Sequence, residues 1–161
     1  MRRIAAEGVG GRERSVHASV VICRHSDENR SREHDGRGSG VSKTILTVDD
    51  SRTMRDMLRL ALEDAGFQVV QAEDGVHGLE VLECGMPDVI ITDINMPRMD
   101  GFGFIEGVRK DSRYRGVPIL VLTTESDAVK KDRARQAGAT GWIVKPFNPT
   151  KLVDAIRRVA A

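Results

Sequence analysis

The sequence predicts an α/β fold in which a parallel five-stranded sheet carries helices on both faces, a doubly wound (βα)5 arrangement. Three observations favour this fold. Five short runs of aliphatic or β-branched residues recur along the chain, stretches with a one-sided apolar helical pattern separate them, and turn residues mark the junctions. Because helices alternate with the strands and cover them on both faces, the strands are expected to pair in parallel.

The chain divides into two parts near residue 42. Residues 1–42 contain eight arginines, no lysine and no aromatic residue, and include the glycine-rich stretch DGRGSG. A segment without aromatic residues buries little apolar surface, so residues 1–42 are predicted to be a disordered extension. Residues 43–161 form the predicted folded domain. The arginine-only basic composition also suggests the hypothesis that the extension lies upstream of a natural start near Val41.

Each strand is predicted from a run of four to six β-forming residues. The runs are 44–48 (TILTV), 68–72 (QVVQA), 88–92 (DVIIT), 118–123 (PILVLT) and 141–144 (GWIV). The helices lie between and after these runs. In the first helix Met54, Leu58 and Leu62 recur at helical spacing, and in the last helix Leu152 and Ile156 do the same.

Several residues mark the expected ends of the helices. Gly66 and Gly138 stand where C-terminal caps are predicted, because glycine adopts the left-handed backbone of such caps at little cost. Asn148 followed by Pro149 is typical of an N-cap and the first helical position.

Composition excludes several classes of function. The chain has 161 residues, 40% of them hydrophobic, which suffices for one core. Its net charge of +1 gives no basic bias toward nucleic acid. The longest apolar runs, VIIT and ILVL, are too short to cross a bilayer, and the N-terminus lacks the apolar core of a secretory signal. We therefore expect a soluble cytoplasmic protein that binds neither nucleic acid nor membrane.

Polar side chains stand at the ends of four predicted strands. Asp49 and Asp50 follow the first strand and Asp93 follows the third, whereas Thr123 ends the fourth and Lys145 follows the fifth. In open parallel sheets, ligands bind beyond the carboxyl ends of the strands. Three carboxylates, a hydroxyl and an ammonium group are therefore predicted to meet on one rim.

This set of groups predicts phosphoryl chemistry. Three crowded carboxylates repel one another, and one lysine offsets only part of their charge. Mg²⁺ is the natural counter-charge, because it prefers one or two carboxylates together with water and phosphate oxygens. Asp93 is predicted to attack a phosphorus atom and form an aspartyl phosphate, with the metal, Lys145 and Thr123 holding the phosphoryl oxygens.

Four motifs in order resemble the receiver domain of two-component response regulators. They are VDDS, TDINMPRMDG, VLTTE and GWIVKPF, and the resemblance runs from Lys43 to Val159. The intervals also agree with the family, with 30 residues from Asp93 to Thr123 and 22 from Thr123 to Lys145. The resemblance implies a flavodoxin-like sheet of strand order 2-1-3-4-5.

The resemblance also assigns the acidic residues. It implies that Asp93 is the phosphoacceptor, which receives its phosphoryl group from a phosphohistidine on a sensor kinase. Asp50 would bind Mg²⁺ directly, Asp49 indirectly, and Asn95 through its backbone carbonyl. Asn95 and Glu125 would influence how quickly the phosphate is lost. Considered alone, Asp50 before Ser51 would sooner be interpreted as a helix cap, and only the joint pattern favours the metal.

The remaining site residues are expected to bind the phosphoryl group or to transmit the signal. The resemblance places Thr123, Thr124 and Lys145 around the phosphoryl group and implies a cis bond between Lys145 and Pro146. Thr123 and Trp142 would form a switch pair that reshapes the face of helix 4, strand 5 and helix 5. The family usually has Tyr, Phe or His at the position of Trp142.

The stretches DDSRTMRDMLRLAL and GWIVKPFNPTKLVDAIRRV resemble stand-alone CheY-type chemotaxis regulators. The resemblance implies a CheA-like sensor histidine kinase as donor and the flagellar motor switch as target. One alternative is a shuttle or sink in a phosphorelay, which passes phosphate to a histidine phosphotransfer protein. Lys130, Lys131, Arg133 and Arg135 lie on the expected contact face.

A more distant alternative is an enzyme, namely a phosphatase of the haloacid dehalogenase type with an aspartate nucleophile. That chemistry needs a second carboxylate two residues after the nucleophile, and here the position is Asn95. The protein is therefore not expected to be an enzyme, beyond phosphorylating itself from a donor and slowly losing the phosphate.

Overall fold

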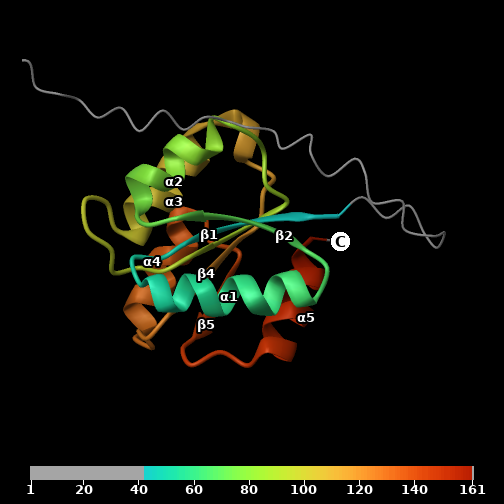
Figure 1. The fold of residues 1–161 in the computed structure, drawn as a ribbon. Helices are drawn as coiled ribbons and strands as arrows, with labels where there is room; N and C mark the ends of the chain where they lie inside the picture. Colours follow the sequence, from blue (N-terminus) through green and yellow to red (C-terminus); the bar gives the residue numbers. More distant parts are fainter. Residues whose placement is uncertain (1–41, 161) are drawn as a thin grey trace, which may run out of the picture.

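The computed structural model describes residues 42–160. The predicted disorder of residues 1–42 falls outside this range except at Ser42, and it stays a prediction. The strands and helices alternate along the chain (Figure 1). They are β1 (Thr44–Val48), α1 (Arg52–Asp64), β2 (Gln68–Ala72), α2 (Gly75–Leu82), β3 (Val89–Thr92), α3 (Gly101–Lys110), the short 3₁₀ helix η2 (Ser112–Tyr114), β4 (Ile119–Thr123), α4 (Ala128–Ala137), β5 (Gly141–Val144) and α5 (Pro149–Val159).

The strands form one sheet of order β2-β1-β3-β4-β5, and every neighbouring pair is parallel. The predicted fold and strand order are confirmed. β1, β2 and β5 have the predicted bounds, whereas β3 and β4 each begin one residue later than predicted. At the start of β3, the Asp88 carboxylate accepts a hydrogen bond from Thr44 N–H at 2.7 Å. Pro118, just before β4, has no N–H to donate.

Helices cover both faces of the sheet (Figure 1). The apolar side chains of the central strands are therefore buried on either side. α1 and α5 pack on one face, where Leu58 and Ile156 join the core. α2, α3 and α4 pack on the other face, where Leu82, Phe104 and Ala134 join it. The polar strand ends thus have a rigid apolar base.

The helix ends follow the predicted capping pattern. Asn148 caps α5 by accepting from Lys151 N–H, and Pro149 occupies the first turn. Gly138 caps the end of α4 with φ 117°, in the left-handed region. At the end of α1 the C-cap is Ala65, and the left-handed Gly66, with φ 92°, follows it. Among residues 42–160, no helix has the length and apolar character needed to cross a membrane.

Candidate functional site

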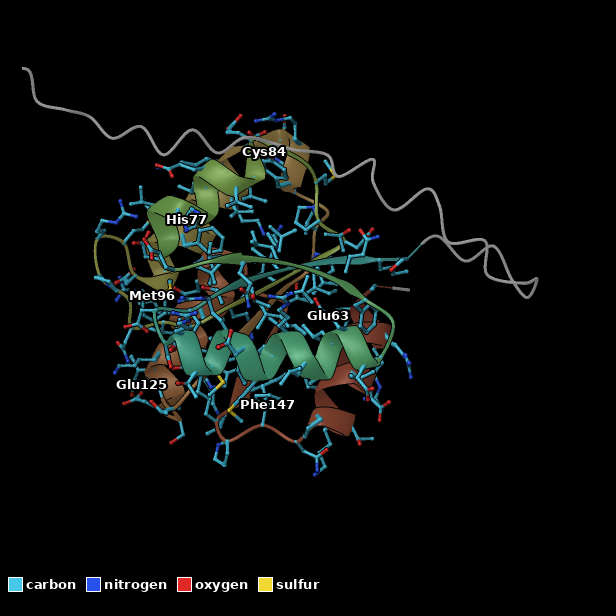
Figure 2. The ribbon with its side chains drawn as sticks, in the orientation of Figure 1. Glu63, His77, Cys84, Met96, Glu125 and Phe147 are labelled. Carbon is cyan, nitrogen blue, oxygen red and sulfur yellow. The ribbon has the colours of Figure 1, made fainter. Side chains whose placement is uncertain are left out.

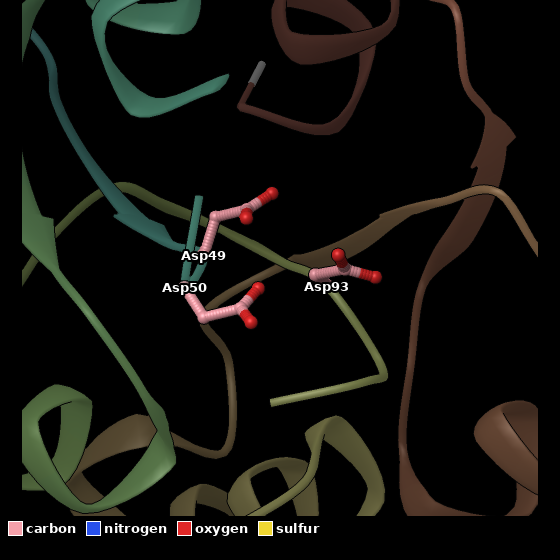
Figure 3. A group of neighbouring side chains, drawn as sticks. All are labelled: Asp49, Asp50 and Asp93. Atoms are coloured by element: carbon pink, nitrogen blue, oxygen red, sulfur yellow. The ribbon is translucent and has the colours of Figure 1, made fainter. Parts of the chain in front are cut away.

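Three carboxylates gather at the carboxyl end of the sheet (Figure 3). Asp49 and Asp50 follow β1, and Asp93 follows the neighbouring strand β3. One oxygen from each carboxylate lies within 4.8 Å of the others. Asp49 and Asp93 are buried and Asp50 is exposed at the rim. The structure therefore brings together the three acids that the sequence places at strand ends.

Lys145 bridges two of these acids from the end of β5. Its Nζ donates to Asp49 Oδ2 at 2.8 Å and to Asp93 Oδ2 at 2.9 Å. Burial alone lowers the pKa of Lys145, but the hydrogen bonds to the two carboxylates and their charges raise it above its usual value. The ammonium group therefore stays charged over the whole physiological range of pH.

Backbone donors fix the orientation of both buried carboxylates. Ser51 N–H donates to Asp49 Oδ1 at 2.8 Å, and Ile94 N–H donates to Asp93 Oδ1 at 2.6 Å. Burial raises the pKa of Asp49, and the hydrogen bonds from Lys145 and Ser51 only partly oppose this effect. Each carboxylate thus has one oxygen bound to the backbone and the other bound to Lys145.

The cluster fits a divalent cation. Three ionised carboxylates and one ammonium group leave two negative charges uncompensated at the rim. Asp50 presents its exposed carboxylate there, whereas both oxygens of Asp49 accept hydrogen bonds. This donor set of carboxylate oxygens suits Mg²⁺.

A chain of hydrogen bonds leads from the rim to Trp142. The Thr123 hydroxyl is buried and accepts from Glu125 N–H at 3.3 Å. The indole N–H of Trp142 donates to the carbonyl oxygen of Glu125 at 3.0 Å. Thr123 and Trp142, the predicted switch pair, are therefore connected through the backbone of one residue, Glu125, in the β4–α4 loop. The sequence does not reveal this link.

A second bridge crosses from the β3–α3 loop to α4. Asn95 Nδ2 donates to Glu125 Oε1 at 3.2 Å, and Lys130 Nζ lies 3.0 Å from Glu125 Oε2. Figure 2 shows Met96 and Glu125 at the same end of the molecule, on these two loops. Sequence reasoning placed Lys130 on the contact face but missed its pairing with Glu125. The sequence offered one indication of this pair, because Lys130 follows Glu125 by five residues and the start of α4 lies between them.

The other predicted residues also lie at this rim. Thr124 and Asn95 are exposed in the loops that follow β4 and β3. The Lys145–Pro146 peptide bond is cis, as expected. Asp50 is not the cap of α1, because Ser51 takes that position and accepts from Met54 N–H.

Residues 45–157 match the family model of the response regulator receiver domain. The chain therefore belongs to the receiver domain family, as the motifs predict. Chemotaxis protein CheY1 of Helicobacter pylori is 40% identical over 117 residues, which cover 71% of this chain and 94% of that protein.

Two further comparisons place the chain within the family. A solved structure of chemotaxis protein CheY4 from Vibrio cholerae matches with a TM-score of 0.72 and 46% identity, over 74% of this chain and 99% of that one. The sensor histidine kinase CheAY of Helicobacter pylori is 33% identical over 147 residues, which are 90% of this chain but only 18% of the kinase. The chain thus spans a small part of that kinase and nearly all of the CheY proteins, and the predicted resemblance to CheY-type regulators is confirmed.

Proposed function

We propose that this receiver is a chemotaxis response regulator that is phosphorylated on Asp93 by a sensor histidine kinase. The observation that carries the proposal is the position of Lys145, which holds Asp93 and Asp49 together beside the exposed Asp50. The names of the relatives support the chemotaxis assignment and a CheA-like donor.

The proposed step is transfer of a phosphoryl group from a phosphohistidine. A carboxylate oxygen of Asp93 forms a bond to phosphorus while the bond between phosphorus and the imidazole nitrogen breaks. The electron pair of that bond stays on the imidazole. Because the Asp93 carboxylate is fixed by Ile94 N–H and by Lys145, it meets the phosphorus in a set orientation.

In the proposed site the acidic residues bind the metal ion, and Lys145 stabilises the negative charge of the phosphoryl group. Asp50, Asp93 and the backbone carbonyl of Asn95 would hold Mg²⁺, with Asp49 in support, and the ion supplies charge stabilisation for the phosphoryl oxygens. Lys145 already lies 2.9 Å from Asp93 Oδ2, so a phosphoryl group on Asp93 would sit beside its ammonium group. Thr123 at the end of β4 and Thr124 in the loop that follows offer hydroxyl groups.

We propose that the signal leaves through the β4–α4 loop. A phosphoryl oxygen that draws the Thr123 hydroxyl inward would disturb its bond to Glu125 N–H and, through the same residue, the bond from Trp142. Trp142 lines a groove of about 90 Å³ with Lys131 and Arg135 between α4 and β5. A change at Glu125 would thus reshape the α4, β5 and α5 face that the partner contacts.

The proposed target is the flagellar motor switch, and transfer to a histidine phosphotransfer protein is the alternative. The same pocket serves both, so binding must decide between them. The protein should be loaded with Mg²⁺ and beryllofluoride, a phosphoryl mimic, and tested for capture of motor-switch protein. Capture that depends on beryllofluoride supports the motor, whereas rapid transfer of phosphate to a phosphotransfer histidine without capture supports the relay.

We further propose that the protein acts in the cytoplasm and is no enzyme toward external phosphoesters. Asn95 stands two residues after the nucleophile, and its amide cannot act as the acid and base that such turnover needs. Slow loss of the protein's own phosphate remains expected. Steady release of phosphate from an added phosphoester would contradict this assignment.

Trp142 provides the first test, because it is the single tryptophan of the chain. Its fluorescence should change on titration with Mg²⁺ and change again with beryllofluoride, since its indole is bonded to the β4–α4 loop. The Asp93→Asn variant should show neither the second change nor tight Mg²⁺ binding. Asp93→Asn that still responds to beryllofluoride like the wild type would refute Asp93 as the acceptor.

A further inference from the structure

A bidentate ion pair joins the loop after Asp93 to the first turn of α2. Arg98 Nε lies 2.7 Å from Asp74 Oδ2, and Arg98 Nη2 lies 3.0 Å from Asp74 Oδ1. Asp74 is only 3% exposed and also caps α2 by accepting from His77 N–H at 2.9 Å. One buried carboxylate therefore holds a helix end and a loop together, and the two parallel hydrogen bonds fix the direction of the arginine.

The backbone of this loop is fixed tightly. Arg98 has φ 63°, in the left-handed region that a residue with a Cβ enters against steric repulsion. Met99 packs so closely on α2 that a Cβ at Gly75 would lie 2.8 Å from Met99 Cγ and 2.9 Å from its carbonyl oxygen. A conformation of this kind persists only where neighbouring contacts hold it, and the ion pair to Asp74 is such a contact.

The same loop begins at the acid cluster. Ile94 N–H donates to the Asp93 carboxylate at 2.6 Å, and Gly101 N–H closes the loop by donating to Ile94 O at 2.8 Å. Between these two points lie Asn95 and Arg98. A shift of the loop therefore moves the peptide group that orients Asp93.

We propose that the Arg98–Asp74 pair is a positioning clasp, which holds the loop of residues 95–100 against α2 and so keeps the Asp93 carboxylate set for metal and phosphoryl binding. The inference rests on the proposed function of Asp93. Arg98 acts as a positioning residue, because its partner is Asp74 and its effect reaches Asp93 through the loop. Supporting contacts of this kind lower the cost of assembling a site.

Two substitutions break the clasp while preserving the local backbone. Asp74→Asn removes the charge but keeps an N-cap, because asparagine caps helices as well as aspartate does. Arg98→Asn removes the guanidinium but tolerates the left-handed backbone. Arg113→Gln is the matched control, since Arg113 is 53% exposed against 52% for Arg98 and pairs with Asp111 at 2.7 Å, away from the acid cluster.

The variants should be compared by calorimetric titration with Mg²⁺, by the initial rate of labelling with acetyl phosphate, and by urea unfolding. Each single variant is expected to bind Mg²⁺ about tenfold more weakly and to be labelled about tenfold more slowly. Tenfold is the lower end of the loss that follows when a residue supporting the metal ligands is removed. The double variant should be no worse than either single, because both remove the same pair. Arg98→Lys, which keeps one donor, should fall between, and Arg113→Gln should match the wild type.

A clasp that serves stability alone gives a different pattern. Urea midpoints would fall in Asp74→Asn and Arg98→Asn while Mg²⁺ affinity and labelling rate stayed at wild-type values, and this would overturn the positioning role. A wild-type protein that neither bound Mg²⁺ nor took label would instead overturn the proposed function, and the clasp with it.

Discussion

Helices α3 and α4 cover the same face of the sheet but are held very differently. Within α3 the buried residues are Gly101, Phe102, Phe104, Ile105 and Val108. Of the ten residues of α4, all of them within the described range, only Ala134 is buried. At about 1.5–3 kcal/mol for each large apolar side chain, α3 is bound to the sheet several times more strongly than α4.

The difference in anchoring fits the proposed roles of the two helices, chemistry beside α3 and signalling through α4. α3 follows the loop of Asp93, so the helix next to the proposed phosphoacceptor is anchored, and the carboxylate can keep a fixed orientation. α4 follows the loop of Glu125 and buries only Ala134 of its own residues, all of which the structure describes. Glu125 is held by hydrogen bonds with Thr123, Asn95 and Trp142 and by an ion pair to Lys130. Elements with few buried contacts open at low free-energy cost. The fold thus places a weakly anchored helix near the firmly anchored loop of Asp93.

The largest expected effect tests whether α4 responds to the acid cluster at all. Asp93→Asn should abolish labelling by acetyl phosphate and remove the beryllofluoride-dependent change in Trp142 fluorescence, because the amide is no nucleophile and carries no charge. Without metal its free energy of unfolding should equal or slightly exceed that of the wild type, since one of three repelling carboxylates is gone.

Asp100→Asn is the control for that variant. Asp100 caps α3 by accepting from Gly103 N–H at 2.8 Å, and asparagine preserves such a cap. Asp100→Asn should therefore label like the wild type. Normal labelling of Asp93→Asn, or a marked loss of its stability in the absence of metal, would contradict the assignment of the crowded acids.

A pair of core substitutions measures the anchoring of the two helices directly. Phe104→Ala should lower the free energy of unfolding by about 3–5 kcal/mol, because Phe104 is fully buried on α3 and the substitution leaves a cavity. Ala134→Gly on α4 should cost about 1 kcal/mol, mainly through lost helix propensity. Urea unfolding of both variants gives the comparison, and similar losses would show that α4 is anchored as firmly as α3.

The strands and the acid cluster were predictable because both follow from strong local patterns. The apolar runs specify β1, β2 and β5 to the residue, and polar residues directly after such runs must fall at the carboxyl rim of a parallel sheet. Asp49, Asp50 and Asp93 are therefore brought together by topology alone. Lys145 reaches the cluster for the same reason.

The contacts between loops were not predictable in this way. Arg98 meets Asp74 across 24 residues, and Trp142 meets Glu125 across 17. Neither loop has a periodic pattern that fixes its path. The left-handed backbone at Arg98 could not be predicted, because the residue there is not the glycine that usually indicates such a conformation. These contacts depend on how two turns pack against each other, which only the folded structure specifies.

A smaller effect concerns the bond that ties the β4–α4 loop. Trp142→Phe keeps an aromatic ring on β5 but removes the N–H donor to Glu125 O. The loss of one such hydrogen bond should lower the free energy of opening of residues 124–137 by about 1 kcal/mol. Hydrogen exchange measured by mass spectrometry should show faster exchange in those residues, while exchange in α3 stays unchanged. Equal acceleration in α3 would mean that the two helices open as one unit.

The smallest expected effect is a pH dependence of the folding stability, which arises from Asp74 at the start of α2. Burial alone raises the pKa of Asp74, but the hydrogen bonds from Arg98 and His77 N–H hold it below its ordinary value. The folded protein therefore binds fewer protons at this group than the unfolded chain does. The stability that results is present above the unfolded pKa of about 3.9 and is lost as the pH falls through the lower folded pKa.

Asp74→Asn should therefore be less stable than the wild type near neutral pH, and the difference should shrink when urea unfolding is repeated below about pH 3.5. The change is expected to be small, because Arg98 is half exposed and solvent screens the pair. Asp49, whose pKa is raised by burial, acts in the opposite sense in both proteins and cancels in the difference. A difference that stays constant with pH would show that the titration of Asp74 contributes nothing to stability, since Asp74→Asn keeps the cap of α2 and removes only the charge.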